Sequence, residues 1–155
     1  MITSLDTNIL LDILIPDENH FQKSKGLLDE YVQKGQLIIC EIVYAELASQ
    51  FLSEKELKDF LSDTGIRLVY STVEALCISG ERWKVYVKNK KRAFQCPQCG
   101  VSTSITCHKC HSPIIVRQHI LSDFIIGAHA FHHAELLLSR DRGFYRTYFK
   151  DLKVV

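Results

Sequence analysis

The chain has 155 residues, 46% of them hydrophobic, which is enough to bury the core of one domain. Its formal net charge of +1 says little about partners. No apolar run approaches the roughly 18 residues of a membrane span, and the first residues lack the basic segment of a secretory leader. We therefore expect a cytoplasmic protein with no membrane contact.

Short apolar segments alternate with helical patterns along the chain. Strands are expected at residues 1–5, 37–40, 66–70 and 136–139, with a further candidate at 152–155. Helical spacing of apolar residues lies between them, at residues 7–14, 21–35, 41–52, 53–61, 71–92 and 121–134, and a short helix is expected after Asp141. Strands that alternate with helices predict an α/β fold with a parallel sheet.

The helix expected from residue 71 ends in a basic run. Its apolar stripe, which the periodicity predicts to face the core, consists of Val73, Leu76, Cys77, Gly80, Trp83 and Val87. From Glu81 to Arg117 there are eight basic residues and one acid. This distribution is typical of a surface that binds a phosphate backbone, and the alternative is an ordinary solvated helix face.

Four acids occupy informative positions in this pattern. Asp6 and Asp141 each follow a predicted strand, Glu46 lies one turn into the helix after the second strand, and Asp123 lies in the first turn of the helix that follows the insert. In parallel sheets, ligands bind outside the carboxyl ends of the strands, so these side chains are expected at one edge of the sheet. Taken one at a time, each acid has a purely structural alternative as a helix cap, a turn residue or a solvated side chain.

Gathered carboxylates repel one another unless a cation compensates their charge. Oxygen ligands suit Mg²⁺ or Mn²⁺, and such an ion lowers the pKa of a bound water and stabilises charge on a phosphate. The four acids together therefore predict a metal-dependent hydrolase of phosphodiesters.

The segments around these acids resemble the four motifs of PIN-domain nucleases, most closely the compact toxins of VapBC toxin-antitoxin pairs. The motifs match at Ser4–Asp12, Val43–Leu47, His119–Ala130 and Leu137–Phe144. Ser139 stands where the family usually has Thr, and it keeps the hydroxyl. Asp12 does not match a family acid and is left out of the predicted site.

The resemblance implies a three-layer α/β/α PIN-like fold with a mostly parallel central sheet over residues 1–155, interrupted by an insert at about 93–116. It also implies a Mg²⁺- or Mn²⁺-dependent endoribonuclease that cleaves single-stranded RNA. Asp6, Glu46, Asp123 and Asp141 would hold the metal, and Asn8 and Ser139 would support them. An antitoxin and a second copy of the chain are the candidate protein partners.

Two other functions stay open at this point. The first is a non-catalytic protein that binds RNA or assembles complexes, for example in RNA or ribosome maturation. The second is a zinc-binding transcription or interaction module.

The insert carries two Cys-x-x-Cys pairs separated by seven residues, at Cys96, Cys99, Cys107 and Cys110. Four thiolates at this spacing predict a structural Zn²⁺ in a closed tetrahedral shell, and a redox pair or an iron-sulfur centre is the alternative. The insert is too short for its own core, so the ion would supply its folding energy. It could contact RNA or another protein.

Three histidines, His129, His132 and His133, have helical spacing near the end of the helix expected at 121–134. We interpret them as histidines on the rim of a packed helix, and a second zinc site is the alternative.

Overall fold

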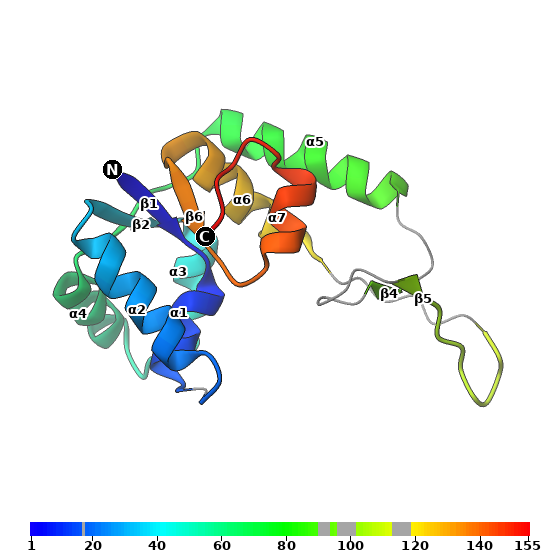
Figure 1. Ribbon diagram of the computed structural model, residues 1–155, viewed down its shortest axis with the longest axis horizontal. Helices are drawn as coiled ribbons and strands as arrows, with labels where there is room; N and C mark the ends of the chain where they lie inside the picture. Colours follow the sequence, from blue (N-terminus) through cyan, green and yellow to red (C-terminus); the bar gives the residue numbers. More distant parts are fainter. Residues whose placement is uncertain (17, 90–93, 96–101, 113–118) are drawn as a thin grey trace.

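A four-stranded parallel sheet forms the centre of the computed structural model, which describes residues 1–16, 18–89, 94–95, 102–112 and 119–155 (Figure 1). The strand order is β3-β2-β1-β6, and every neighbouring pair is parallel. These strands are β1 (Ile2–Leu5), β2 (Gln36–Ile39), β3 (Ile66–Leu68) and β6 (Leu136–Leu138). The predicted α/β fold with a parallel sheet is confirmed.

Helices cover the sheet because each pair of parallel strands needs a crossover. The helices are α1 (Thr7–Leu14), α2 (Phe21–Val32), α3 (Glu41–Ala48), α4 (Glu54–Thr64), α5 (Val73–Asn89), α6 (Leu121–His133) and α7 (Arg142–Tyr148). The crossovers through α1 to α4 move from β1 to β3, whereas α5 and α6 return to β6. Right-handed crossovers of opposite direction place their helices on opposite faces, which gives three layers. In Figure 1, α5, α6 and α7 lie together, away from α1 and α2.

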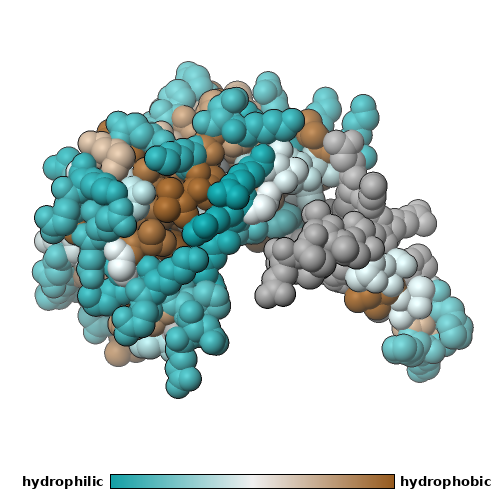
Figure 2. Space-filling view, viewed as in Figure 1, coloured by the Kyte–Doolittle hydropathy of each residue, from teal (hydrophilic) through white to brown (hydrophobic). Residues whose placement is uncertain are grey.

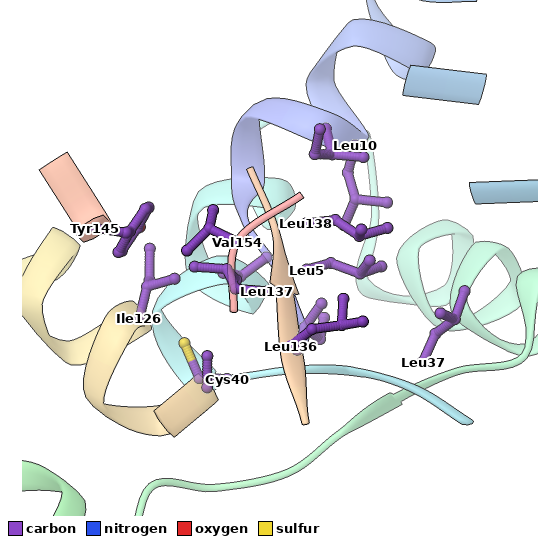
Figure 3. Packing of buried hydrophobic residues seen from close by; sticks show 14 of the residues in the cluster. Leu5, Leu10, Leu37, Cys40, Ile126, Leu136, Leu137, Leu138, Tyr145 and Val154 are labelled. Carbon is purple, nitrogen blue, oxygen red and sulfur yellow. The ribbon is translucent and has the colours of Figure 1, made fainter. Parts of the chain in front are cut away.

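The core lies on both sides of the sheet. All three residues of β6 are buried, as expected for a strand with helices on both faces. Leu5 and Leu10 pack against this strand, together with Val154 from the C-terminal segment (Figure 3). That segment, predicted as a last strand, forms an isolated parallel bridge between Leu137 and Val154.

The predicted buried face of α5 is wrong. Val73 is 72% exposed and Val87 48% exposed, while Ala75 and Ser79 are buried. α5 lies along α6, and small side chains allow two helices to approach closely. Apolar residues occur around most of α5, so periodicity alone did not identify the side that faces α6.

The insert contributes a second, two-stranded antiparallel sheet of β4 (Phe94–Gln95) and β5 (Ser102–Thr103). Cys96 and Cys99 lie outside the described residues, as do the basic residues at 90–92 and 117. Within the ranges given above, no helix is long and apolar enough to cross a bilayer.

Candidate active site

The centre of the site follows from the register of two neighbouring strands. Leu5 of β1 pairs with Leu138 of β6, so the next residues, Asp6 and Ser139, leave the sheet side by side. The backbone N–H of Asp6 donates to the Leu138 carbonyl at 3.0 Å, which holds the two strand ends together. The Ser139 hydroxyl then donates to Asp6 Oδ2 at 2.5 Å.

Asp6 is a buried carboxylate, 7% exposed, at the N-terminus of α1. Its side chain makes no capping hydrogen bond to the helix, so the capping alternative fails for this residue. Asn8 Nδ2 donates to Asp6 Oδ2 at 2.7 Å, and the Tyr145 hydroxyl donates to the same oxygen at 3.4 Å. Burial raises the pKa of Asp6 to about 6, against the opposing effect of the hydrogen bond from Ser139.

Glu46, on α3, lies close enough to Asp6 to affect its pKa. The Thr7 hydroxyl donates a short hydrogen bond to Glu46 Oε2, which ties the start of α1 to the middle of α3. The negative charge of Glu46 also contributes to the raised pKa of Asp6. Glu46 is therefore held within the cluster and is not merely a solvated side chain.

Asp123 and Asp141 meet at an imidazole. His119 Nδ1 lies 3.7 Å from Asp123 Oδ2 and 3.7 Å from Asp141 Oδ2. The His119 ring stacks on Phe144 with 4.1 Å between centroids, which fixes its position. Both acids also serve helix ends: Asp123 accepts from the Ile120 N–H at 2.9 Å, and Asp141 accepts from the Phe144 N–H at 3.4 Å.

The four predicted acids thus converge at the carboxyl edge of the sheet. The charges of Asp123 and Glu46 raise the pKa of Asp6. The pKa of the buried Tyr145 hydroxyl is raised mainly by burial and also by Asp6, Asp123 and Asp141. The two predicted supporting residues lie within this cluster, because Asn8 Nδ2 is 3.3 Å from Ser139 Oγ and both contact Asp6.

Sequence reasoning missed a second layer of polar residues behind the acids. Arg140 donates its backbone N–H to Asn8 Oδ1 at 3.1 Å and pairs through its guanidinium with Asp12 Oδ1 at 3.2 Å. Asp12 is 3% exposed and also accepts from the Ser24 hydroxyl at 2.6 Å. Asp12, which sequence reasoning left out of the predicted metal site, fixes the loop that carries Asp141 through its ion pair with Arg140.

The side chains of the cluster suit a hard divalent cation by their chemistry, since all four acids offer oxygen donors. Within the described part of the chain, no three of the Asp, Glu, His or Cys side chains are already arranged to hold an ion. The donors of Thr7, Asn8 and Ser139 engage the carboxylates instead. A Mg²⁺ ion needs only one or two direct carboxylates and keeps several waters, so the oxygen donors of this cluster fit it by their chemistry.

Half of the predicted zinc site is described. Cys107 and Cys110 lie at one turn, where the His111 N–H donates to the Cys107 carbonyl at 2.8 Å and the Cys107 N–H donates to the Ser112 carbonyl at 2.9 Å. The pKa of the Cys110 thiol is lowered by hydrogen bonds from Ser112 and, to a smaller extent, by the Cys107 side chain. Cys96 and Cys99 fall outside the described residues, so the four-cysteine centre stays a prediction.

The sequence suggested that the three histidines near the end of α6 all lie on the rim of the helix, but they do not all lie there. His129 is 0% exposed, and burial lowers its pKa to about 4. Among the described residues, neither ring nitrogen has a hydrogen-bond partner of normal geometry, although the Val69 backbone is close enough to favour the charged form. The centroid of the His129 ring lies 4.7 Å from that of His133. Because His129 is buried, the interpretation that it lies on the rim of the helix was wrong.

Comparison with known proteins agrees with this arrangement. The family model described as "PIN domain" matches residues 4–150, which includes all four acids. This chain belongs to the PIN-domain family. The comparison with curated proteins gave no match.

Several solved structures are similar to this PIN domain in fold. A chain of VapBC2 from Rickettsia felis, bound to promoter DNA, has a TM-score of 0.62 at 17% identity, covering 100% of this chain and 98% of that one. VapBC-1 from nontypeable Haemophilus influenzae gives 0.60 at 18% identity, covering 100% and 97%. FitAcB from Neisseria gonorrhoeae gives 0.60 at 19% identity, covering 99% and 96%. At these identities the likeness concerns the fold.

Proposed function

We propose that this PIN domain is a Mg²⁺- or Mn²⁺-dependent endoribonuclease that cleaves single-stranded RNA. The observation that carries the proposal is the buried carboxylate of Asp6, whose pKa is raised to about 6 among Glu46 and Asp123, with Asp141 at the same edge. Buried carboxylates that repel one another cost stability, and functional sites are where this cost is retained. A bound cation would offset the repulsion.

The residues of the site have different roles according to their positions. Asp6, Glu46, Asp123 and Asp141 would hold the cation. The ion, when bound, would lower the pKa of a coordinated water and stabilise charge on the phosphate.

Ser139 and Asn8 donate to one oxygen of Asp6 and so fix the direction in which the other oxygen points. Thr7 does the same for Glu46. His119 lies between the two more exposed acids and keeps them at one place.

The test is cleavage of a fluorescent single-stranded RNA by the purified protein. We expect cleavage with Mg²⁺ or Mn²⁺, none with a chelator, and cleavage lowered by roughly 100-fold or more with Asp6→Asn. Asp59→Asn is the matched control, since Asp59 is an exposed acid on α4 that pairs with Lys55 at 2.6 Å. Tight RNA binding without cleavage under any of these conditions would favour the non-catalytic alternative and overturn the enzyme.

A role as the toxin of a toxin-antitoxin pair is supported by the fold shared with chains of VapBC and FitAcB structures. On this proposal, expression of the chain arrests growth, and coexpression of a small neighbouring gene restores it. Asp6→Asn should abolish the arrest. Growth arrest that persists with Asp6→Asn would separate toxicity from the carboxylate site.

A structural Zn²⁺ on Cys96, Cys99, Cys107 and Cys110 is proposed from their spacing and from the turn that holds Cys107 and Cys110 together. Elemental analysis of the purified protein should give one zinc per chain, lost in Cys107→Ser. Cys77→Ser is the control, since Cys77 is an exposed cysteine on α5. Zinc retained in Cys107→Ser, or iron in its place, would contradict this assignment.

A further inference from the structure

A small cavity lies next to the carboxylate cluster, between the first turn of α2 and the loop that joins β6 to α7. It has a volume of about 160 Å³ and is lined by Ile9, His20, Lys23, Ser24, Leu27, Ser139, Arg140 and Arg142. A water in the liquid takes about 30 Å³, so the cavity has room for a group of several heavy atoms. In Figure 2, hydrophilic side chains cover the part of this face where α2 lies.

The charge of the lining is one-sided. Lys23, Arg140 and Arg142 are cations, and among the residues that the structure describes no acid lines the cavity. Asp12 pairs with one amino group of Arg140, and a guanidinium keeps further donors after such a pair. The first turn of α2, a helix of 12 residues, adds the positive end of its dipole.

The cavity is joined rigidly to the acidic cluster. Ser139 belongs to both, because it lines the cavity and donates its hydroxyl to Asp6. The Arg140 backbone donates to Asn8, which in turn donates to Asp6. Asp12 and Ser24 fix the Arg140 side chain from α1 and α2. A group bound in the cavity therefore has a defined position relative to the acids.

We infer that this cavity binds a phosphate of the RNA strand next to the phosphate that is cleaved. The inference rests on the proposed function and adds a subsite to it. A cationic cavity beside a cluster of acids separates two tasks: the acids hold a metal at the reacting phosphate, while the cations hold the neighbouring phosphate and set the register of the strand. Lys23 and Arg142 make this contact, and Arg140 is oriented for it by Asp12.

The experiment compares Lys23→Gln and Arg142→Gln with Lys25→Gln in the RNA cleavage assay. Lys25 lies on the same helix and pairs with Asp29 at 2.7 Å, and it does not line the cavity, so its change removes the same charge elsewhere. We expect KM to rise in the two cavity variants with little change in kcat. The slope of log affinity against log salt should fall by about 0.7 for each lost phosphate contact in single-stranded RNA.

A second measurement identifies the group that is bound. RNA substrates carry one neutral methylphosphonate, placed on the 5′ or the 3′ side of the cleaved phosphate. At one of these two places the substitution should raise KM for the wild-type protein and have little further effect in Lys23→Gln, because both changes remove the same contact. Additive effects at both places would overturn the inference.

Other outcomes are equally informative. Cavity variants that match Lys25→Gln in both KM and salt slope would overturn the subsite while RNA cleavage by the wild type stands. Loss of binding to a protein partner with unchanged RNA parameters would assign the cavity to that partner and overturn the subsite as well. Failure of the wild-type protein to bind or cleave RNA would instead overturn the proposed function itself.

Discussion

Two regions beside α6 hold buried ionisable groups in opposite ways. At the N-terminus of α1, where the charge of Asp123 on α6 is felt, Asp6 is buried but accepts hydrogen bonds from Ser139, Asn8 and Tyr145. Toward the last turn of α6, His129 is fully buried, and neither ring nitrogen has a hydrogen-bond partner of normal geometry among the described residues. Burial raises the pKa of Asp6 to about 6 and lowers that of His129 to about 4.

At neutral pH this difference leaves Asp6 charged and His129 neutral. The hydrogen-bond donors around Asp6 keep a carboxylate at a place where its charge costs free energy, as expected of a site that binds a cation. His129 lies in the interior as a neutral ring, beside His133 and near Glu41. Burial alone therefore does not identify a functional group, whereas burial together with converging donors does.

The largest expected effect comes from Asp6→Asn. Cleavage should fall by roughly 100-fold or more, the usual cost of losing one group that stabilises charge in the transition state. The free energy of unfolding at neutral pH should rise by up to about 3 kcal/mol, because the folded-state pKa of about 6 lies above the ordinary 3.8 and charging Asp6 costs stability as the pH rises through this window. Activity assays and urea unfolding at pH 7.5 measure both. A variant that is both inactive and less stable would contradict the account.

His129→Leu tests the other end of the comparison. The folded-state pKa of His129 lies below its ordinary 6.5, so protonation costs stability as the pH falls from 6.5 toward 4, by about 3 kcal/mol in full. The variant should lose less stability than the wild type over this range. Denaturant unfolding at pH 7 and pH 4.5 measures the difference, and equal losses in both proteins would contradict it.

The two groups oppose each other in the wild-type protein between about pH 4 and pH 6. Acidification relieves the cost of charged Asp6 and adds the cost of protonated His129. The dependence on pH should therefore steepen toward acid instability in Asp6→Asn and flatten or reverse in His129→Leu. Asp6→Asn thus isolates the contribution of His129 to the pH dependence of stability, and His129→Leu isolates that of Asp6.

Ser139→Ala is expected to have a smaller effect on the carboxylate cluster than Asp6→Asn. Loss of a side chain that orients a metal-binding carboxylate typically costs 10- to 100-fold, and kcat/KM should fall within roughly this range. Ser139→Thr is the matched control, because it keeps the hydroxyl that donates to Asp6 at 2.5 Å. Activity in Ser139→Thr as low as in Ser139→Ala would mean that the hydroxyl is not what matters at this position.

Sequence patterns predicted for a physical reason which side chains gather at the carboxyl edge of the sheet. The carboxyl ends of neighbouring parallel strands must lie together, so the positions of Asp6 and Asp141 after two such strands predicted that they lie near each other. Asp123 was placed by its position at a helix start, and Ser139 by the resemblance to the PIN-domain motif. His119 and Arg140 were missed because their roles depend on loop geometry: His119 lies between two acids, and Arg140 pairs with an acid from α1.

The rest of the fold shows what periodicity does not determine. α5 has apolar residues on more than one side, and its packing against α6 determines which side is buried. The depth of His129 was equally hidden, since its helix neighbours are small and apolar whether the ring is buried or exposed. Partners in space, not spacing in sequence, decided both outcomes.

The smallest expected effect is that of His132→Gln, at the exposed end of α6. His132 contributes to the lowered pKa of His133, after the larger effect of burial, and to that of His129. Removing it should raise the pKa of both histidines slightly, because an exposed charge is well screened by solvent. Titration of the imidazole signals by NMR measures this. If the pKa of His129 rose close to its ordinary 6.5, repulsion between histidines and not burial would be the cause of the shift, and the contrast with Asp6 would lose its basis.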